Sequence, residues 1–282
     1  MRIDNDGIGL HVAADGPADG PPVLLLHGIS GSTATYDFLV PELPGHRLLR
    51  LDFRGHGQSD RAPDDYLLEG FASDAEAVLD QVVGGPAVMV GHSLGGLTAT
   101  YVAQRRPDLV TALFLEDPPL FFDKATYEST AFASVFPLMQ AAIVGWQQEG
   151  ATPDQIGAAM AAVPSMSGQG SMGDENMPDA MASTGYALHL LDPTVFDPVI
   201  AGMSIGSFDP AVPVGAPGVL LQPDRDLGAA FFGDHASRLT AAAPKIDVVE
   251  VHDVGHLIHD SRTHRGEYLD QLRRFLDAWA PA

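Results

Sequence analysis

An apolar run, Ala87-Val88-Met89-Val90, leads directly into Gly91-His92-Ser93-Leu94-Gly95, after which helical spacing begins. A serine on a sharp turn between a strand and a helix needs small neighbours, because the turn brings backbone segments close together; Gly91 and Gly95 supply that room. The turn leaves the Ser93 hydroxyl near the helix N-terminus, where the amide of Leu94 can face a developing oxyanion. We therefore interpret Ser93 as a nucleophile and Leu94 as an oxyanion-hole donor, in preference to a chance G-x-S-x-G in a glycine-rich chain.

Short apolar runs alternate with helical patterns on both sides of this turn. Near-continuous apolar runs indicate strands buried on both faces, as in a parallel sheet covered by helices. Helical spacing and stop signals predict intervening helices over 71–82, 94–106 and 231–242, and a final amphipathic helix from Tyr268 to Trp279. The predicted strands cover residues 22–27, 47–52, 87–91, 112–115, 218–222 and 246–251.

The middle of the chain has a different character. Between residues 119 and 212 the strand-like runs vanish, and Ala, Met, Gly and Pro become more frequent. Thr152-Pro153-Asp154 predicts a helix start, since a hydroxyl can cap the helix and proline is tolerated in its first turn. We therefore expect one α/β core, residues 1–118 and 213–282, interrupted by an inserted helical cap, residues 119–212.

A serine hydroxyl is a weak nucleophile and needs a base. Of the 11 histidines, His256 is the best placed, because it follows the last predicted strand through Val254-Gly255 at the carboxyl edge of the sheet. A neutral imidazole there can take the serine proton and return it to a leaving group. The other histidines of this region read as surface or helix-capping residues: His252, His259 and His264.

The carboxylate that orients this base is ambiguous in the sequence. The chain order Ser…Asp…His predicts an acid in the loop after strand 218–222, where Asp226 has room to bend towards His256 and Asp224 reads as a turn residue. The competitor is Asp117, at the end of the strand that follows the nucleophile helix. We favour Asp226 and keep Asp117 as the alternative.

A second oxyanion donor is suggested by His27-Gly28-Ile29-Ser30-Gly31, which follows another apolar strand. Gly28 and Gly31 let the backbone approach a substrate closely. The N–H of Ile29 can then pair with that of Leu94 in one oxyanion hole.

Composition excludes several classes of function. The 282 residues carry 15 Lys and Arg against 37 Asp and Glu, a net charge of −22 that disfavours nucleic-acid and membrane-surface binding. The absence of cysteine excludes a disulfide framework, thiolate zinc sites and a cysteine nucleophile. Residues 1–6 lack the apolar core of a signal peptide, and the uncharged segment 129–146 is broken by Pro137. We expect a cytoplasmic protein.

Taken together, the motifs resemble those of the α/β-hydrolases. They are His27-Gly28-Ile29, the segment Asp52 to Asp60, Gly91-His92-Ser93-Leu94-Gly95 and Gly255-His256. The resemblance implies a Ser-Asp-His triad, a mostly parallel eight-stranded sheet with helices on both faces, a lid after strand six, no cofactor and no metal. It also implies that His56 has a structural role, in shaping the loop beside the oxyanion hole.

Two features depart from the usual family pattern. Pro223 stands where the usual acid loop of the family has glycine, and some relatives, including lactonases of resorcylic lactone mycotoxins, place their acid after strand six. Matched without gaps from the nucleophile, that position is Asp117. Ser93 argues against the haloalkane dehalogenases and epoxide hydrolases of the same fold, which use an aspartate nucleophile.

The predicted cap points to an apolar substrate. Flexible Met and aromatic side chains over a serine suit an adaptable hydrophobic ligand, although most of them also pack the cap on the core. Lys124 is the only Lys or Arg between residues 119 and 212, so no clamp for an anionic group is visible. The apolar cap residues considered are Phe121, Phe122, Phe132, Phe136, Met139, Ile143, Trp146, Met160, Met166 and Met172.

These observations favour a serine hydrolase that cleaves a carboxylic ester or lactone of a neutral, hydrophobic small molecule through an acyl-enzyme. Hydrolysis of a carbon–carbon bond, or perhydrolysis, with the same triad is an alternative, but carbon–carbon hydrolases of this type need a cationic anchor. A non-enzymatic ligand-binding receptor on the same fold is a third alternative. The sequence favours it less, because it contains a complete set of catalytic residues.

Overall fold

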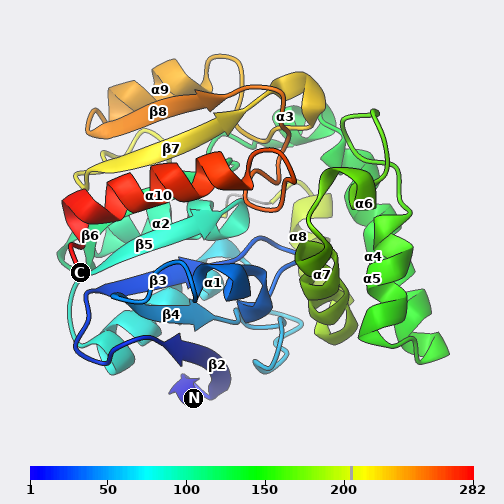
Figure 1. Ribbon diagram of the computed structural model, residues 1–282, viewed down its shortest axis with the longest axis horizontal. Coiled ribbons are helices and arrows are strands. Elements are labelled where there is room, and N and C mark those ends of the chain that lie inside the picture. Colours follow the sequence, from blue (N-terminus) through cyan, green and yellow to red (C-terminus); the bar gives the residue numbers. More distant parts are fainter. Residues whose placement is uncertain (204–205) are drawn as a thin grey trace.

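The computed structural model describes residues 1–203 and 206–282 and contains one eight-stranded sheet in the order β1-β2-β4-β3-β5-β6-β7-β8 (Figure 1). Strands β3 to β8 pair in parallel, whereas β1 and β2 are antiparallel to their neighbours. The predicted fold class is therefore confirmed. The strands are β1 Arg2–Asn5, β2 Ile8–Asp15, β3 Pro22–Leu26, β4 Arg47–Leu51, β5 Ala87–His92, β6 Val110–Glu116, β7 Gly218–Pro223 and β8 Ile246–Val251.

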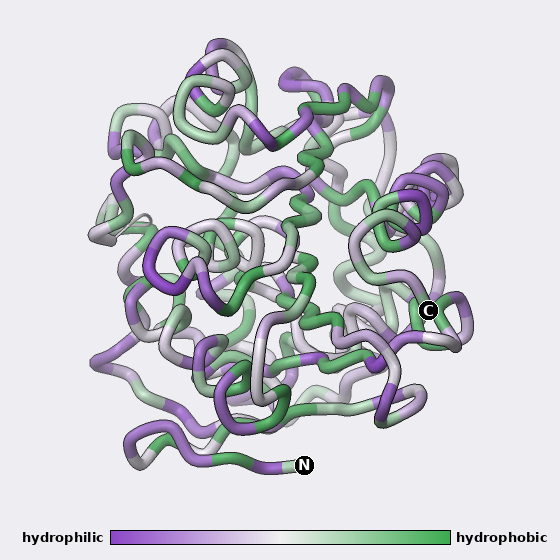
Figure 2. The backbone as a smooth tube through the Cα atoms, turned by 90° about the vertical axis from the view of Figure 1, so that its left-hand side faces the viewer, coloured by the Kyte–Doolittle hydropathy of each residue, from purple (hydrophilic) through white to green (hydrophobic). Residues whose placement is uncertain are grey.

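Alternating side chains of the parallel strands fill two hydrophobic layers. On β3, Val23 and Leu25 face the 3₁₀ helix η1 (Thr33–Leu39) and α10 (Arg265–Trp279). Leu24 and Leu26 face the opposite layer, which holds α1 (Leu68–Val78), α2 (Leu94–Arg105) and α9 (His235–Ala242). Each fully buried leucine contributes about 1.5 to 3 kcal/mol to folding. Figure 2 shows hydrophobic segments gathered towards the middle of the molecule, and hydrophilic segments on outer turns.

The core helices differ from the predicted ranges mainly at their ends. Helix α1 spans Leu68–Val78 and continues as a π-helical turn, Leu79–Val83. Helix α2 (Leu94–Arg105) matches the prediction, and α9 (His235–Ala242) begins four residues later than predicted, after Gly233 with its φ of 65°. Strands β1 and β2 were missed, because their sequences mix polar and apolar residues and contain no continuous apolar run.

The helices from α3 to α8 come between β6 and β7 in the chain and lie beyond the carboxyl ends of the strands, where the arrowheads of β5 and β7 point (Figure 1). Thr152 caps the start of α5, as the sequence predicted, and the structure adds a reciprocal bond from Gln155 that completes a capping box. The predicted cap range 119–212 includes residues 204 and 205, which lie outside the described residues. The elements are α3 Lys124–Glu128, α4 Phe132–Glu149, α5 Pro153–Ala161, α6 Met172–Glu175, α7 Pro178–Leu190, the 3₁₀ helix η4 Pro193–Phe196 and α8 Asp197–Ile200.

The uncharged segment 129–146 lies mostly within α4, which contains Pro137. Among the described residues, no helix combines the length and hydropathy that crossing a bilayer requires. Much of α4 is instead partly exposed, with Phe132 and Ile143 as its buried residues.

A buried ion pair connects three elements on the α1 side of the sheet. The Asp74 carboxylate on α1 accepts hydrogen bonds from Arg54 Nε at 3.0 Å and Nη2 at 2.7 Å, and from Asn5 Nδ2 at 2.9 Å. Asp74 is fully buried and Arg54 is nearly so. Arg54 also pairs with Asp65, whose side chain is half exposed, so removing Asp74 leaves the buried guanidinium with only this partner at the surface.

We therefore expect Asp74→Ala to lower the free energy of unfolding by about 3 to 5 kcal/mol, measured by urea denaturation. Asp108→Ala removes an exposed carboxylate, one of two that pair with the partly exposed Arg106, and is the matched control that should leave the denaturation midpoint near that of the unmodified chain. Equal midpoints for the two variants would contradict the role assigned to the buried pair.

Candidate active site

Ser93 occupies a strained turn between β5 and α2. Its φ of 52° and ψ of −116° lie in a region that L-residues rarely adopt. Hydrogen bonds on both sides of Ser93 hold its backbone in this conformation. Ser93 N donates to the carbonyl oxygen of Glu116 at 2.9 Å, and Leu97 N donates to that of Ser93 at 3.0 Å. The turn therefore fixes where the serine side chain projects.

The glycines around Ser93 are required by close backbone contacts. A Cβ at position 95 would overlap the carbonyl oxygen of Leu26 at the end of β3, and a Cβ at position 91 would lie 2.5 Å from the carbonyl carbon of Gly95. Backbone atoms cannot move aside as a flexible side chain can. The first turn of α2 therefore packs directly on the sheet, as the small residues of the motif predicted.

His256 and Asp117 form a buried pair next to this turn. Asp117 Oδ2 lies 2.6 Å from His256 Nδ1, and Asp117 is fully buried. Its two carboxylate oxygens also accept hydrogen bonds from Ala230 N at 2.8 Å and Phe231 N at 2.7 Å. Three donors thus hold the carboxylate, and the carboxylate in turn fixes the imidazole orientation.

The structure does not bring Asp226 to His256, contrary to our preference for Asp226 over Asp117. Asp226 is exposed in a 3₁₀ turn, Arg225–Leu227, directly after β7. Its neighbour Asp224 accepts a hydrogen bond from Asp253 N at 2.8 Å, and so supports the loop that follows β8. Asp117 lies closer to the serine turn because β6 is the direct neighbour of β5 in the sheet.

Two backbone amides lie beside Ser93, those of Ile29 and Leu94. Among the described residues, no hydrogen bond is formed by the N–H of Ile29 or of Leu94. The Ile29 loop borders the serine, since a Cβ at position 28 would lie 3.4 Å from Ser93 Cβ. Such free amides beside a serine are suited to bind a negatively charged oxygen.

Two buried side chains, those of Asp52 and His56, contact the loop that carries Ile29. Asp52 Oδ1 accepts a hydrogen bond from Thr33 N at 2.6 Å, and His56 Nε2 lies 2.8 Å from the carbonyl oxygen of Ile29. Burial lowers the pKa of His56 and so favours its neutral form. Both residues contact the loop rather than the cavity, which agrees with the structural role expected for His56.

Two cavities meet at Ser93 and share Ile29, Phe132 and Phe136 in their walls. The first is almost entirely apolar and extends between the core helices and η4–α8. The second runs under α4, α5 and α7, and His256 lines only this one. No hydrogen bond joins the side chains of Ser93 and His256 in the described parts of the chain. The first cavity is otherwise lined by Tyr66, Leu68, Phe71, Leu94, Leu97, Pro119, Phe122, Val195, Pro198, Val199, Met203 and Ala230.

The second cavity is rich in methionine. Met139, Met160, Met166 and Met172 contribute to its wall, together with the hydroxyls of Ser183 and Thr184. Of the apolar cap residues singled out from the sequence, seven thus line one of the two cavities, while three do not: Phe121, Ile143 and Trp146.

Residues 21–186 match the sequence model of the family described as the alpha/beta hydrolase fold, which covers more than half of the chain. The chain belongs to the α/β-hydrolase family. Among solved structures, this α/β-hydrolase is similar to E-2-(acetamidomethylene)succinate hydrolase, with a TM-score of 0.77 at 20% identity over 98% of both chains. It is also similar to Est816, described as an N-acyl homoserine lactone degrading enzyme, with a TM-score of 0.71 at 22% identity over 98% of this chain and 100% of that one. At these identities the likeness shows the fold alone.

Sequence relatives match only part of their length. The α/β-hydrolase is 39% identical to the mouse (Mus musculus) sn-1-specific diacylglycerol lipase ABHD11 over 36% of this chain and 34% of that protein. It is 38% identical to lipase LipV of Mycobacterium tuberculosis over 41% of this chain and 44% of that protein. The matches thus span about a third to under half of the length of these curated relatives.

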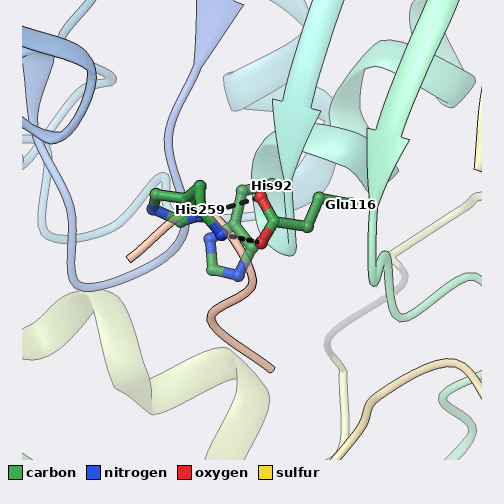
Figure 3. Close-up of side chains that lie close together, drawn as sticks. All are labelled: His92, Glu116 and His259. Carbon is green, nitrogen blue, oxygen red and sulfur yellow. Dashed lines mark hydrogen bonds and ion pairs between the residues drawn. The ribbon is translucent and has the colours of Figure 1, made fainter. Parts of the chain in front are cut away.

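A second histidine–carboxylate pair lies beside the first and was missed in the sequence. His259 Nδ1 is 2.7 Å from Glu116 Oε2, and both side chains are buried, whereas the sequence suggested that His259 was a surface or capping residue (Figure 3). Two signals were available, because Glu116 directly precedes Asp117 and His259 follows His256 by three residues. His252 is exposed and His264 does precede α10, as expected.

These two residues and His92 also offer the donor types of a metal site. One ligand atom from each of His92, Glu116 and His259 lies within 4.8 Å of the others. However, His259 and Glu116 contact each other directly, so each already has a hydrogen-bond partner.

The contact of Gly95 with β3 gives a test of the serine turn. We expect Gly95→Ala to lower the free energy of unfolding of the α/β-hydrolase by about 1 to 3 kcal/mol or more, because the methyl group displaces backbone. Gly145→Ala in α4 is the matched control: nothing lies within 4 Å of its added Cβ, and it should raise stability by up to about 1 kcal/mol. Denaturant titration of both variants measures the difference, and a harmless Gly95→Ala would refute the close packing.

Proposed function

We propose that this α/β-hydrolase is a serine hydrolase that cleaves a carboxylic ester or lactone of a neutral, hydrophobic small molecule through an acyl-enzyme. One observation carries the proposal: Ser93 and His256 line the same cavity, Asp117 contacts His256, and the amides of Ile29 and Leu94 beside Ser93 form no hydrogen bond within the part of the chain that the structure describes. A nucleophile, an oriented base and an oxyanion site in one place are the parts that acyl transfer requires.

In the proposed reaction His256 Nε2 takes the proton of Ser93 as Oγ attacks the substrate carbonyl carbon. The Ile29 and Leu94 amides donate to the resulting oxyanion, while Asp117 stabilises the imidazolium. The imidazolium then returns the proton to the leaving oxygen as the carbon–oxygen bond breaks. Water, deprotonated by His256, then attacks the acyl-enzyme. As the bond between the acyl carbon and Oγ breaks, the imidazolium returns the proton to Ser93 Oγ, and the acid is released.

The two cavities suggest where the acyl part and the leaving alcohol of the substrate bind. The general acid has to reach the leaving oxygen, and His256 lines only the methionine-rich second cavity. The leaving alcohol is therefore assigned to the second cavity, and the acyl part to the first, whose walls include Leu94 and Leu97 of α2.

The charge of the cavity walls supports a neutral substrate. Among the described residues that line the two cavities there is no lysine or arginine, and Lys124 lies on the surface beside Glu128. His259 lines the second cavity, but its ring is already paired with Glu116. This counts against the carbon–carbon hydrolase alternative, which needs a cation for a substrate carboxylate. The names of the relatives, two lipases and a lactone-degrading enzyme, agree with an ester or lactone bond.

We expect Ser93→Ala to abolish turnover of any ester or lactone that the chain cleaves, because Ser93 carries the hydroxyl that lies beside both the Ile29 loop and the cavity wall formed by His256. The experiment is an ester and lactone panel run with and without a serine-directed phosphonate, followed by mass spectrometry of the modified chain. The adduct should map to Ser93; turnover that persists in Ser93→Ala would refute the proposal.

Asp117→Asn and Asp226→Asn together test which acid orients His256. An asparagine at position 117 cannot stabilise the imidazolium, and we expect kcat to fall by about a thousandfold to ten-thousandfold. Asp226→Asn, at the exposed position, should leave kcat unchanged. Steady-state kinetics of the two variants gives the answer, and the reverse ranking would return the role to Asp226.

A further inference from the structure

Two consecutive carboxylates at the end of β6 hold two histidines of one loop. Asp117 contacts His256, and Glu116 contacts His259, three residues further along. Glu116 binds His259 twice: Oε1 accepts a hydrogen bond from His259 N at 3.0 Å, and Oε2 lies 2.7 Å from the ring Nδ1. One side chain thus fixes both the backbone and the ring of His259.

His92 connects this second pair to the first. Its ring centroid lies 4.6 Å from that of His256 and 4.8 Å from that of His259. Its Nε2 is 3.0 Å from the backbone carbonyl oxygen of His256. Figure 3 shows Glu116 reaching from the end of β6 towards His259, with His92 alongside at the end of β5. The residue directly before Ser93 therefore contacts the backbone of the proposed base.

The protonation states within this group differ. Burial opposes a charge on His259, but Asp260 and Glu116 outweigh it and raise the pKa of His259 to about 9. Burial, together with the nearby His256 and His259, holds the pKa of His92 well below its usual range. At neutral pH His259 is therefore a cation and His92 is neutral. Since a carbonyl only accepts, the single proton of His92 is on Nε2 and is donated to His256.

The cation is enclosed by groups from several elements. Asp260 Oδ1 lies 3.4 Å from His259 Nε2, and Arg265 Nε donates to the His259 carbonyl oxygen at 2.7 Å. Burial raises the pKa of Tyr36 and Tyr268, so both phenols stay neutral. The titratable and charged groups around His259 are Glu116 of β6, His92 of β5, Tyr36 of η1, Asp260, Arg265 and Tyr268 of the following loop and α10, and Asp179 of α7 beyond Arg265.

A metal ion is a less suitable occupant of this group. A bound ion would require neutral His259, and ligand distances of about 2.0 to 2.2 Å to the metal would need Glu116 and His259 to separate. The described geometry has them in direct contact instead. The protonated imidazole supplies the positive charge that Glu116 needs.

We propose that the Glu116–His259 ion pair, acting through His92, positions the loop that carries His256, and so sets the place of the base relative to Ser93. These are positioning residues, which do not touch the reacting atoms. The proposal rests on the proposed serine-hydrolase function. It assigns a purpose to a buried charged pair that the reaction itself does not use.

The test compares Glu116→Gln and His259→Asn with the unmodified chain, on an ester that the latter cleaves. Both variants keep polar groups in place but remove the charge, and kcat should fall by about 10- to 100-fold with KM within about twofold, because misplacement of a base lowers the chemical step. His46→Asn is the matched control, because His46 is also a buried histidine, bound to the Ala280 carbonyl oxygen far from the site. Its kcat should not change.

The pH profile separates positioning from simple loss of stability. In the unmodified chain kcat should fall as the pH rises through about 9, where His259 loses its charge. The stability that the pair contributes follows the same sign: it is complete below the unfolded pKa of about 6.5 and is lost through the folded value. In Glu116→Gln the alkaline fall should move to lower pH. Ring NMR of His259 follows its titration directly and does not depend on turnover.

Unchanged kcat in both variants, an equal loss in His46→Asn, or a His259 ring that titrates near its ordinary value would overturn the positioning proposal. Loss of activity with a chelator, restored by zinc, would overturn it in favour of a metal site. If Glu116→Gln does not fold, His259→Asn and the profile of the unmodified chain still decide. A chain that cleaves no ester and is not labelled at Ser93 refutes the proposed function, whereas labelling with unaffected variants refutes only the positioning role.

Discussion

The close packing of the first turn of α2 on the end of β3 is the contact on which the rest of the site depends. It leaves no room for a side chain at Gly95, and so forces the chain to turn sharply at Ser93. The same contact brings the amide of Leu94 beside the loop that follows Leu26, where the Ile29 amide lies. The strained serine and the two unpaired amides are therefore consequences of one backbone approach.

The order of the strands determines what else reaches this point. Because β5 and β6 are parallel neighbours, with His92 opposite Glu116 in the register, their carboxyl ends deliver Ser93 and Asp117 side by side. Glu116 and Asp117 then bind the loop after β8 at two positions: Asp117 contacts the side chain of His256, and Glu116 binds the backbone and the ring of His259, three residues further along. A carboxylate from β7 would have to cross β6 to make the same contact.

Much of this arrangement was predictable from the sequence, and the exceptions have physical reasons. The parallel strands, the serine turn and His256 follow from apolar runs and from glycines at fixed spacing, which are local signals. The preference for Asp226 over Asp117 does not agree with the structure, because the position of each carboxylate depends on the path of its loop. Asp117 adopts a φ of 44°, a conformation that its sequence does not indicate. His259 was misread for a similar reason, since its burial depends on a partner 143 positions away in the chain.

The methionines around the second cavity have a consequence for the chemical durability of the protein. The chain has no cysteine, so its thioethers are the sulfur groups that oxidants can attack, and Met139, Met166 and Met172 are only partly buried. Conversion of a thioether to its sulfoxide turns a flexible apolar wall into a polar one. Met203, about half exposed, lines the first cavity, so oxidizable thioethers border both cavities beside Ser93. An oxidant would therefore make the cavity walls more polar while the buried sheet stays intact.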